Sequence, residues 1–284
     1  MEGRCQRENP WPKGTLWGMI LPSASPFGWL LAAAAAVAYA VPAAAGPRLG
    51  TGATRTALAL AWGLHGAVLA WALVGETPPR FGFAPALSMT AWLVLTVYAV
   101  ERQLFPQMQA RWMLAGLGAV VVLLASVFPG QPLHGTASPW LPLHLTLGIA
   151  SYGLFAAAVV HAALMARAER QIRQAADPHS GMPLLTLERL TFRFVMAGFV
   201  LLTATLLAGG LLGEQLYGRA WRWDHKVVFS LLSWVTFAIL LLGRTQFGWR
   251  GRSAMRVLYG GAMLLLLAYV GSRFVLEVVL GKSA

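Results

Sequence analysis

Charged residues and cysteines are scarce in this sequence, and each shortage excludes a class of protein. Only 11% of the 284 residues are charged, while 57% are hydrophobic and the mean hydropathy is +0.62. A soluble domain carries roughly a quarter charged residues, so this chain lacks the polar surface that a soluble fold needs. The single cysteine, Cys5, excludes a disulfide framework, a C-x-x-C redox pair and a C-x-x-C-H attachment motif.

The sequence instead contains long runs of apolar residues. Each is about 18 residues or longer, the length at which a helix crosses a bilayer. The predicted spans are 27–45, 57–74, 84–101, 111–128, 142–167, 190–212, 225–243 and 253–280. Period-2 alternation is absent, which argues against a barrel. The sequence therefore predicts an all-α membrane protein built as a bundle of eight transmembrane helices.

The arginines and lysines predict how this bundle is oriented. Of the 22 basic residues, 13 lie in the gaps after the odd-numbered spans and 9 lie elsewhere. By the positive-inside rule the first set faces the cytoplasm, so both termini lie outside. The net charge of +12 indicates orientation and attraction to anionic lipid rather than nucleic-acid binding, because the basic residues are spread along helix ends. Residues 1–18 read as a polar extension with Met19 as a second possible start, and 19–284 read as one membrane domain.

Two histidines lie deep in the apolar runs. His65 falls near the middle of the second span, between Gly63 and Gly66. An ionisable side chain at that depth usually faces the bundle interior and serves a function, and the two glycines leave room for a flat ligand or for another helix. A neutral imidazole bonded to a carbonyl or hydroxyl of a neighbouring helix is an equally good interpretation. For His161, near the cytoplasmic end of the fifth span, a hydrogen bond between packed helices is the favoured role.

The predicted outer side gathers the other informative residues. The connector 129–144 contains no charged residue but holds His134, Trp140 and His144. The connector before the seventh span, "GEQLYGRAWRWDHK", supplies a second group: Arg219, Trp221, Arg222, Trp223, Asp224 and His225. A tryptophan belt at the membrane surface explains scattered Trp residues, but not this density of Trp, charge and histidine.

Haem fits this set of residues. Its iron takes imidazole as an axial ligand, tryptophan can cover its broad face, and arginine pairs with its propionates. Zinc is the competing interpretation, but a zinc site usually adds cysteine or several carboxylates, and the acids near these histidines are Glu214 and Asp224. We therefore expect a non-covalent b-type haem (heme) with His144, His134 and His65 as candidate iron ligands. Patterns typical of hydrolases and kinases are missing from the sequence.

The uncharged connector 129–144 is predicted to fold over the outer mouth of the bundle as a lid. Four prolines fix φ along it: Pro129, Pro132, Pro139 and Pro142. A stiff lid would hold His134 and Trp140 over a flat ligand with little ordering entropy lost on binding. Packing of the loop on the bundle, with His134 bonded to a carbonyl, is the simpler interpretation.

The segment "LPLHLTLGIASYGLFAAA", residues 141–158, resembles the cytochrome c assembly membrane proteins of the CcsA/HemX type, and most closely their YpjD-like inner-membrane branch. The likeness covers about residues 20–281. Its most distinctive segments are "MPLLTLERLTF" at 182–192, "GWRGR" at 248–252 and "AYVGSRF" at 268–274.

In these relatives a Trp-rich external loop ending in W-x-W-D presents haem, with histidines on flanking loops as axial ligands. The resemblance carries this role to "WRWD" at 221–224 and to His144, and His134 and His65 match histidines of the YpjD-like branch. Three features depart from the pattern. The Trp-rich loop is reduced to its tail, an external histidine near the C-terminus is absent, and Leu242 stands where relatives have histidine. Ligation by two histidines from flanking loops is therefore not carried over intact.

The leading hypothesis is a non-enzymatic haem-handling protein of the bacterial inner membrane. It would support cytochrome c assembly or haem supply, with an assembly or haem-biosynthesis protein as partner. The alternative is a HemX-like membrane regulator or scaffold without bound haem, whose cytoplasmic segment 168–189 docks a soluble enzyme. A small-molecule transporter is less favoured, because no span shows the Gly/Pro-interrupted pairs typical of inverted repeats.

Overall fold

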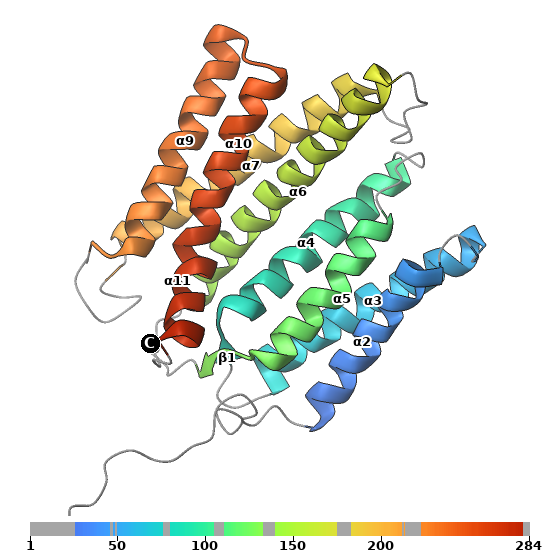
Figure 1. The fold of residues 1–284 in the computed structure, drawn as a ribbon. Helices are drawn as coiled ribbons and strands as arrows, with labels where there is room; N and C mark the ends of the chain where they lie inside the picture. Colours follow the sequence, from blue (N-terminus) through green and yellow to red (C-terminus); the bar gives the residue numbers. More distant parts are fainter. Residues whose placement is uncertain are drawn as a thin grey trace, which may run out of the picture.

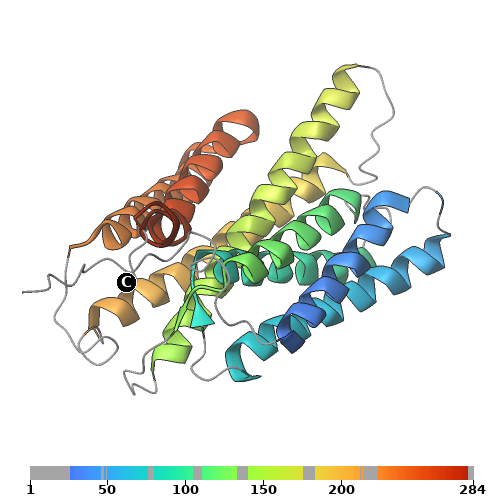
Figure 2. The same cartoon turned by 60° about the horizontal axis from the view of Figure 1, so that its bottom comes forward.

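The computed structural model is a bundle of long helices (Figures 1 and 2). It describes residues 26–45, 48, 50–75, 80–104, 111–132, 140–174, 183–211, 213 and 223–280. The main helices are α2 (Pro26–Ala45), α3 (Thr51–Ala70), α4 (Phe83–Leu104), α5 (Arg111–Val127), α6 (Leu141–Arg173), α7 (Leu184–Leu211), α9 (His225–Phe247) and α10 (Gly251–Leu266). A π-helical turn, η1 (Trp71–Gly75), extends α3, while η2 (Leu267–Gly271), α11 (Ser272–Phe274) and η3 (Val275–Val279) extend α10.

Seven of the described helices are long and apolar enough to cross a membrane. A shorter apolar stretch, Leu114–Val127 within α5, accompanies them. The prediction of an all-helical membrane bundle is therefore confirmed. In both views α6 and α7 lie between the group α2–α5 and the group α9–α11 (Figures 1 and 2).

Several helices are longer than the apolar runs predicted, and α3, for example, begins at Thr51 instead of residue 57. Helix α6 continues to Arg173, beyond the expected end at 167, because "ARAERQIR" at 166–173 is rich in strong helix formers. Helix α7 begins at Leu184, before the expected start at 190, directly after Pro183, whose carbonyl accepts the first hydrogen bonds of the helix. Hydropathy marks the part of a helix that lies in lipid, and charged turns extend the helix beyond that part.

Aromatic rings and glycines set the close approaches between helices. Trp62 of α3 stacks on Trp92 of α4 with centroids 5.2 Å apart, and the Trp92 indole N–H donates to the Trp62 carbonyl at 3.0 Å. A Cβ on Gly66 would lie 3.2 Å from the Trp92 ring. Gly66 thus makes room for a neighbouring helix, which was one of the two roles expected for it.

A second aromatic pair joins the helices of the C-terminal half. Phe155 of α6 and Phe237 of α9 stack with ring centroids 3.8 Å apart, and both rings are buried. A Cβ on Gly198 of α7 would lie 3.2 Å from the Phe155 ring, and one on Gly261 of α10 would lie 2.8 Å from the Phe237 ring. Four helices therefore converge on one stacked pair.

A two-stranded antiparallel sheet, whose strands are separated in the sequence by α4 and α5, joins two connectors at one end of the bundle. Strand β1 (Arg80–Phe81) pairs antiparallel with β2 (Gln131–Pro132). Gly130 precedes β2 with a φ of 81°, a conformation that favours glycine, and its backbone lies against Phe81. We call the end that carries β1 and β2 the hairpin end. Helix α2 begins and η3 stops at this end (Figure 1).

Candidate functional site

His144 lies in the first turn of α6, where α7 passes close beside it. The His144 backbone N–H donates to the carbonyl of Trp140 at 3.0 Å, so the helix backbone fixes where the imidazole begins. A Cβ on Gly209 of α7 would lie 3.3 Å from His144 Cε1. The imidazole is therefore held, partly buried, in the seam between α6 and α7, while Trp140 is 49% exposed.

Trp223, Asp224 and His225 lie at the start of α9. Asp224 Oδ1 accepts the backbone N–H of Val227 at 3.1 Å, which makes Asp224 the N-cap of α9. The cap of α9 is therefore Asp224 and not the neighbouring His225. Trp223 is 73% exposed and His225 is also exposed, so both side chains are accessible from outside the bundle.

The remaining residues of the predicted outer site, His134, Arg219, Trp221 and Arg222, lie outside the described residues. The lid proposed for the connector 129–144 also stays a prediction, because 133–139 are not described. Gln131 and Pro132, near the start of the connector, pair with Phe81 and Arg80 in the two-stranded sheet. Its other end is fixed by Pro142 in the first turn of α6.

His65 lies in the core rather than near the surface set. It is fully buried, with Tyr39 Oη 3.2 Å from Nδ1 and Ser88 Oγ 2.9 Å from Nε2. These contacts connect α2, α3 and α4 through one imidazole. They favour the interpretation of His65 as a packing residue bonded to hydroxyls, and iron ligation by His65 stays a prediction.

A second buried contact involves an acid that the sequence did not single out. Nε2 of His161 lies 2.9 Å from a carboxylate oxygen of Glu101 on α4, and its Nδ1 lies 2.8 Å from the carbonyl of Ala157. The contact between α4 and α6 supports the helix-packing role expected for His161. Glu101 gave only a weak signal, since it stands at the end of an apolar run and resembles an ordinary interfacial acid.

Two segments that are distinctive in the sequence meet at the end of the bundle opposite the hairpin. Glu188, from the segment 182–192, forms an ion pair with Arg244 near the end of α9 and lies 3.9 Å from Arg250 of "GWRGR". Glu188 is only 9% exposed. Its carboxylate holds α7 to α9.

The donor set at the hairpin end was predicted to hold haem rather than a metal ion bound by several side chains. Within the described ranges, no three His, Cys, Asp or Glu side chains gather as a metal site. Haem needs only one or two imidazoles. At this end the described residues supply two: His144, with the exposed ring of Trp140 one turn before it, and the exposed His225 at the start of α9.

Comparison with known proteins assigns this chain to a family. Residues 54–280 match the family described as Cytochrome C assembly protein. The inner membrane protein YpjD of Escherichia coli K12 is 32% identical over 159 residues, which cover 55% of this chain and 60% of YpjD. The resemblance seen in the sequence is thereby confirmed.

Shorter matches join the chain to proteins named for cytochrome c biogenesis. CcsA of Nostoc punctiforme is 32% identical over 111 residues, 38% of this chain and 31% of CcsA. CcsA of Prochlorococcus marinus subsp. pastoris is 34% identical over 88 residues, 31% of this chain and 28% of CcsA. The matched segments span less than two thirds of each of these relatives.

Proposed function

The chain belongs to the cytochrome c assembly protein family, and we propose that it is a non-enzymatic protein that handles haem at the hairpin end of its bundle. It is a multi-pass inner-membrane protein. Its proposed task is cytochrome c assembly or haem supply, with an assembly or haem-biosynthesis protein as partner. The observation that carries the proposal is His144, an imidazole fixed at the α6–α7 seam and bordered by Gly209.

In this proposal His144 is the axial ligand of a non-covalent b-type haem. Gly209 leaves space beside the imidazole that any larger side chain would narrow. Trp140 and Trp223 are exposed aromatic rings that can cover the macrocycle. His134, Trp221, Arg219 and Arg222 complete the proposed site, with the arginines facing the propionates. Asp224 takes part indirectly, because its cap fixes the start of α9.

The proposal includes a topology of eight crossings with both termini outside. Helix α5 is counted as a crossing although its apolar part is short. The start of α2 and the end of η3 lie at the same end of the bundle, as an even number of crossings requires (Figure 1). Reporter fusions at Ala176 and Gly130 test the orientation. We expect a cytoplasmic signal at Ala176 and a periplasmic signal at Gly130, and the reverse pattern would place the proposed site in the wrong compartment.

The optical spectrum of the purified protein tests the haem site. We expect a Soret band in detergent-purified protein, taken as isolated or after titration with haem. His144→Ala should reduce haem retention at least tenfold, because the side chain that binds iron is gone. His225→Ala is the matched control, since it removes an exposed histidine at the start of α9, and it should weaken retention only slightly. A protein that stays colourless in haem titrations, or equal and negligible effects of both variants, would contradict the proposal.

A further inference from the structure

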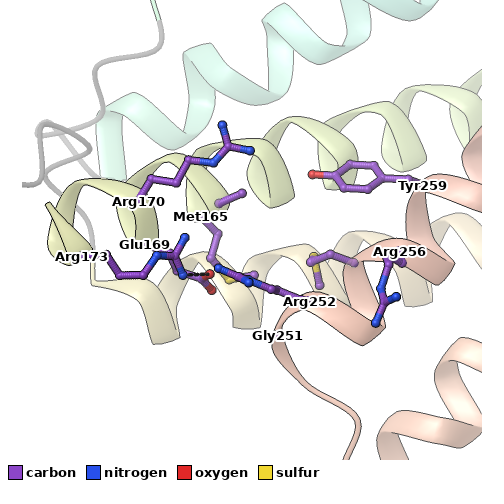
Figure 3. A pocket seen from close by; sticks show the side chains of 10 residues that line it. Met165, Glu169, Arg170, Arg173, Gly251, Arg252, Arg256 and Tyr259 are labelled. Atoms are coloured by element: carbon purple, nitrogen blue, oxygen red, sulfur yellow. Dashed lines mark ion pairs between the residues drawn. The ribbon is translucent and has the colours of Figure 1, made fainter.

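A cavity of about 600 Å³ lies between the last turns of α6 and the first turns of α10, at the end opposite the hairpin (Figure 3). Met165 and Met255 are 4% and 5% exposed and form its floor together with Ala166. The two helices run antiparallel here, since α6 stops where α10 begins. Each contributes about two helical turns, so the cavity extends roughly 12 Å along the helices.

Four arginines surround this apolar floor: Arg170, Arg173, Arg252 and Arg256. Figure 3 shows Arg252 reaching from α10 toward Glu169 and Arg173 of α6, and Tyr259 pointing across from α10 toward α6. Glu169 is the single carboxylate in the lining, and it lies 3.8 Å from Arg173. Four guanidinium groups against one carboxylate leave an excess of positive charge at the rim.

The other arginines of the rim are available to a ligand. Within the part of the chain that the structure describes, Arg170 and Arg252 form no ion pair with a carboxylate, and Arg256 contacts the hydroxyl of Ser253 at 3.5 Å. Arg244 at the same end differs, because it is paired with the carboxylate of Glu188, which also lies 3.9 Å from Arg250. Arg170 and Arg252 at the rim have no such carboxylate partner among the described residues.

The positive-inside rule accounts for the number of arginines at this end of the bundle. It does not account for a concave site in which two helices hold guanidinium groups around a methionine floor. Guanidinium groups bind phosphate oxygens through paired hydrogen bonds. Methionine covers an apolar group of irregular shape, since its side chain is flexible and polarizable.

We propose that this cavity binds a phosphate-bearing anion, with the phosphate at the arginine rim and the adjoining apolar part of the ligand on the methionine floor. The phosphate comes either from the headgroup of an anionic phospholipid or from a soluble compound. Glu169 stays paired with Arg173 in the complex and so does not repel the anion. The site lies at the opposite end of the bundle from the proposed haem site and is independent of it.

Removing single arginines tests whether the positive charge at the rim binds the anion. The thermal midpoint of the full-length protein in neutral detergent is measured with added phosphatidylglycerol, phosphatidylcholine or inorganic phosphate. Wild-type protein should be stabilised by phosphatidylglycerol or by phosphate, and not by phosphatidylcholine. Arg170→Gln and Arg252→Gln should each weaken the apparent affinity about fivefold. Arg167→Gln is the matched control, since it removes an exposed arginine of α6 that does not line the cavity, and it should leave the affinity unchanged.

Filling the cavity tests whether the ligand occupies its volume, and it leaves the charge of the rim unchanged. Ala166→Leu places a larger side chain on the floor and should abolish the stabilisation while all four arginines remain. Stabilisation by phosphatidylglycerol alone identifies a lipid headgroup, and stabilisation by inorganic phosphate identifies a soluble ligand. Equal losses in Arg167→Gln and Arg170→Gln would overturn the proposal in favour of diffuse surface charge. A wild-type protein that responds to neither phosphatidylglycerol nor phosphate would also overturn it.

Discussion

His65, in the interior of the bundle, is fully buried with a hydroxyl near each ring nitrogen, whereas His144, at the hairpin end, lies partly exposed in a seam between two helices. His161 resembles His65, since it is 2% exposed and lies between a carboxylate and a carbonyl. His225 resembles His144, since it stands at the start of a helix and is exposed.

This difference distinguishes histidines that hold helices together from the histidines that are proposed to lie at the haem site. A buried polar group is costly unless it is hydrogen-bonded, so the interior histidines have partners on neighbouring helices. Such partners compete with any external ligand for the ring nitrogens. A histidine at a helix start has its backbone fixed but its ring near the surface, which suits a ligand that arrives from outside. The interior should therefore control stability, and the hairpin end should control binding.

The Glu101–His161 pair should give the largest change in stability. Glu101→Ala removes one partner from a buried pair and leaves the His161 imidazole without it, which should cost about 3 kcal/mol of the free energy of unfolding. Denaturant unfolding in detergent, followed by tryptophan fluorescence, measures this loss. Glu101→Gln keeps the shape and a hydrogen-bonding group, so it should cost about 1 kcal/mol. Unchanged stability in Glu101→Ala together with lost activity in cells would mean that the pair serves function rather than packing.

His65→Ala should have the next largest effect. The change leaves a cavity and two buried hydroxyls, those of Tyr39 and Ser88, without their imidazole partner, and should cost about 2 kcal/mol. Tyr39→Phe is the control, because it removes one of the two contacts and should cost about 1 kcal/mol. The haem retained per folded protein should stay at the wild-type level in both variants. If His65→Ala keeps its stability but loses the Soret band, His65 is an iron ligand and the contrast with His144 is wrong.

The helices of this protein were predictable, because lipid imposes a simple rule on them. The apolar runs predicted the start of α2 to within one residue. They predicted the start of α9 at His225, where the helix begins in the structure. The end of α6 and the start of α7 were each placed six residues inside the helix, because hydropathy locates an apolar run, whereas the Ala, Arg, Glu and Gln residues after that run continue α6.

The contacts between helices were not predictable from one sequence. Glu101 and His161 lie on different helices, and nothing in either apolar run indicates which faces meet. The same holds for Glu188, whose partner Arg244 lies on α9. The candidate haem site was predicted from residue types and from the family resemblance, and four of its members lie outside the described residues: His134, Arg219, Trp221 and Arg222. The structure places His144 in the first turn of α6 beside α7, and haem binding there stays a prediction.

Gly209→Ala should have the smallest effect on stability and an effect on binding that stability does not explain. The new Cβ would lie 3.3 Å from His144 Cε1, so the imidazole must shift by a few tenths of an ångström. Alanine also favours the helix by about 1 kcal/mol over glycine, which offsets the crowding and keeps the free energy of unfolding nearly unchanged. Haem retention should fall several-fold, because a displaced imidazole would hold the haem iron less well. Gly148→Ala is the matched control in the same α6–α7 seam. Its Cβ would meet Thr205 at an ordinary 3.6 Å and leave His144 in place, so retention should be unchanged. Equal haem retention in Gly209→Ala, Gly148→Ala and the wild type would show that the seam around His144 does not hold the ligand.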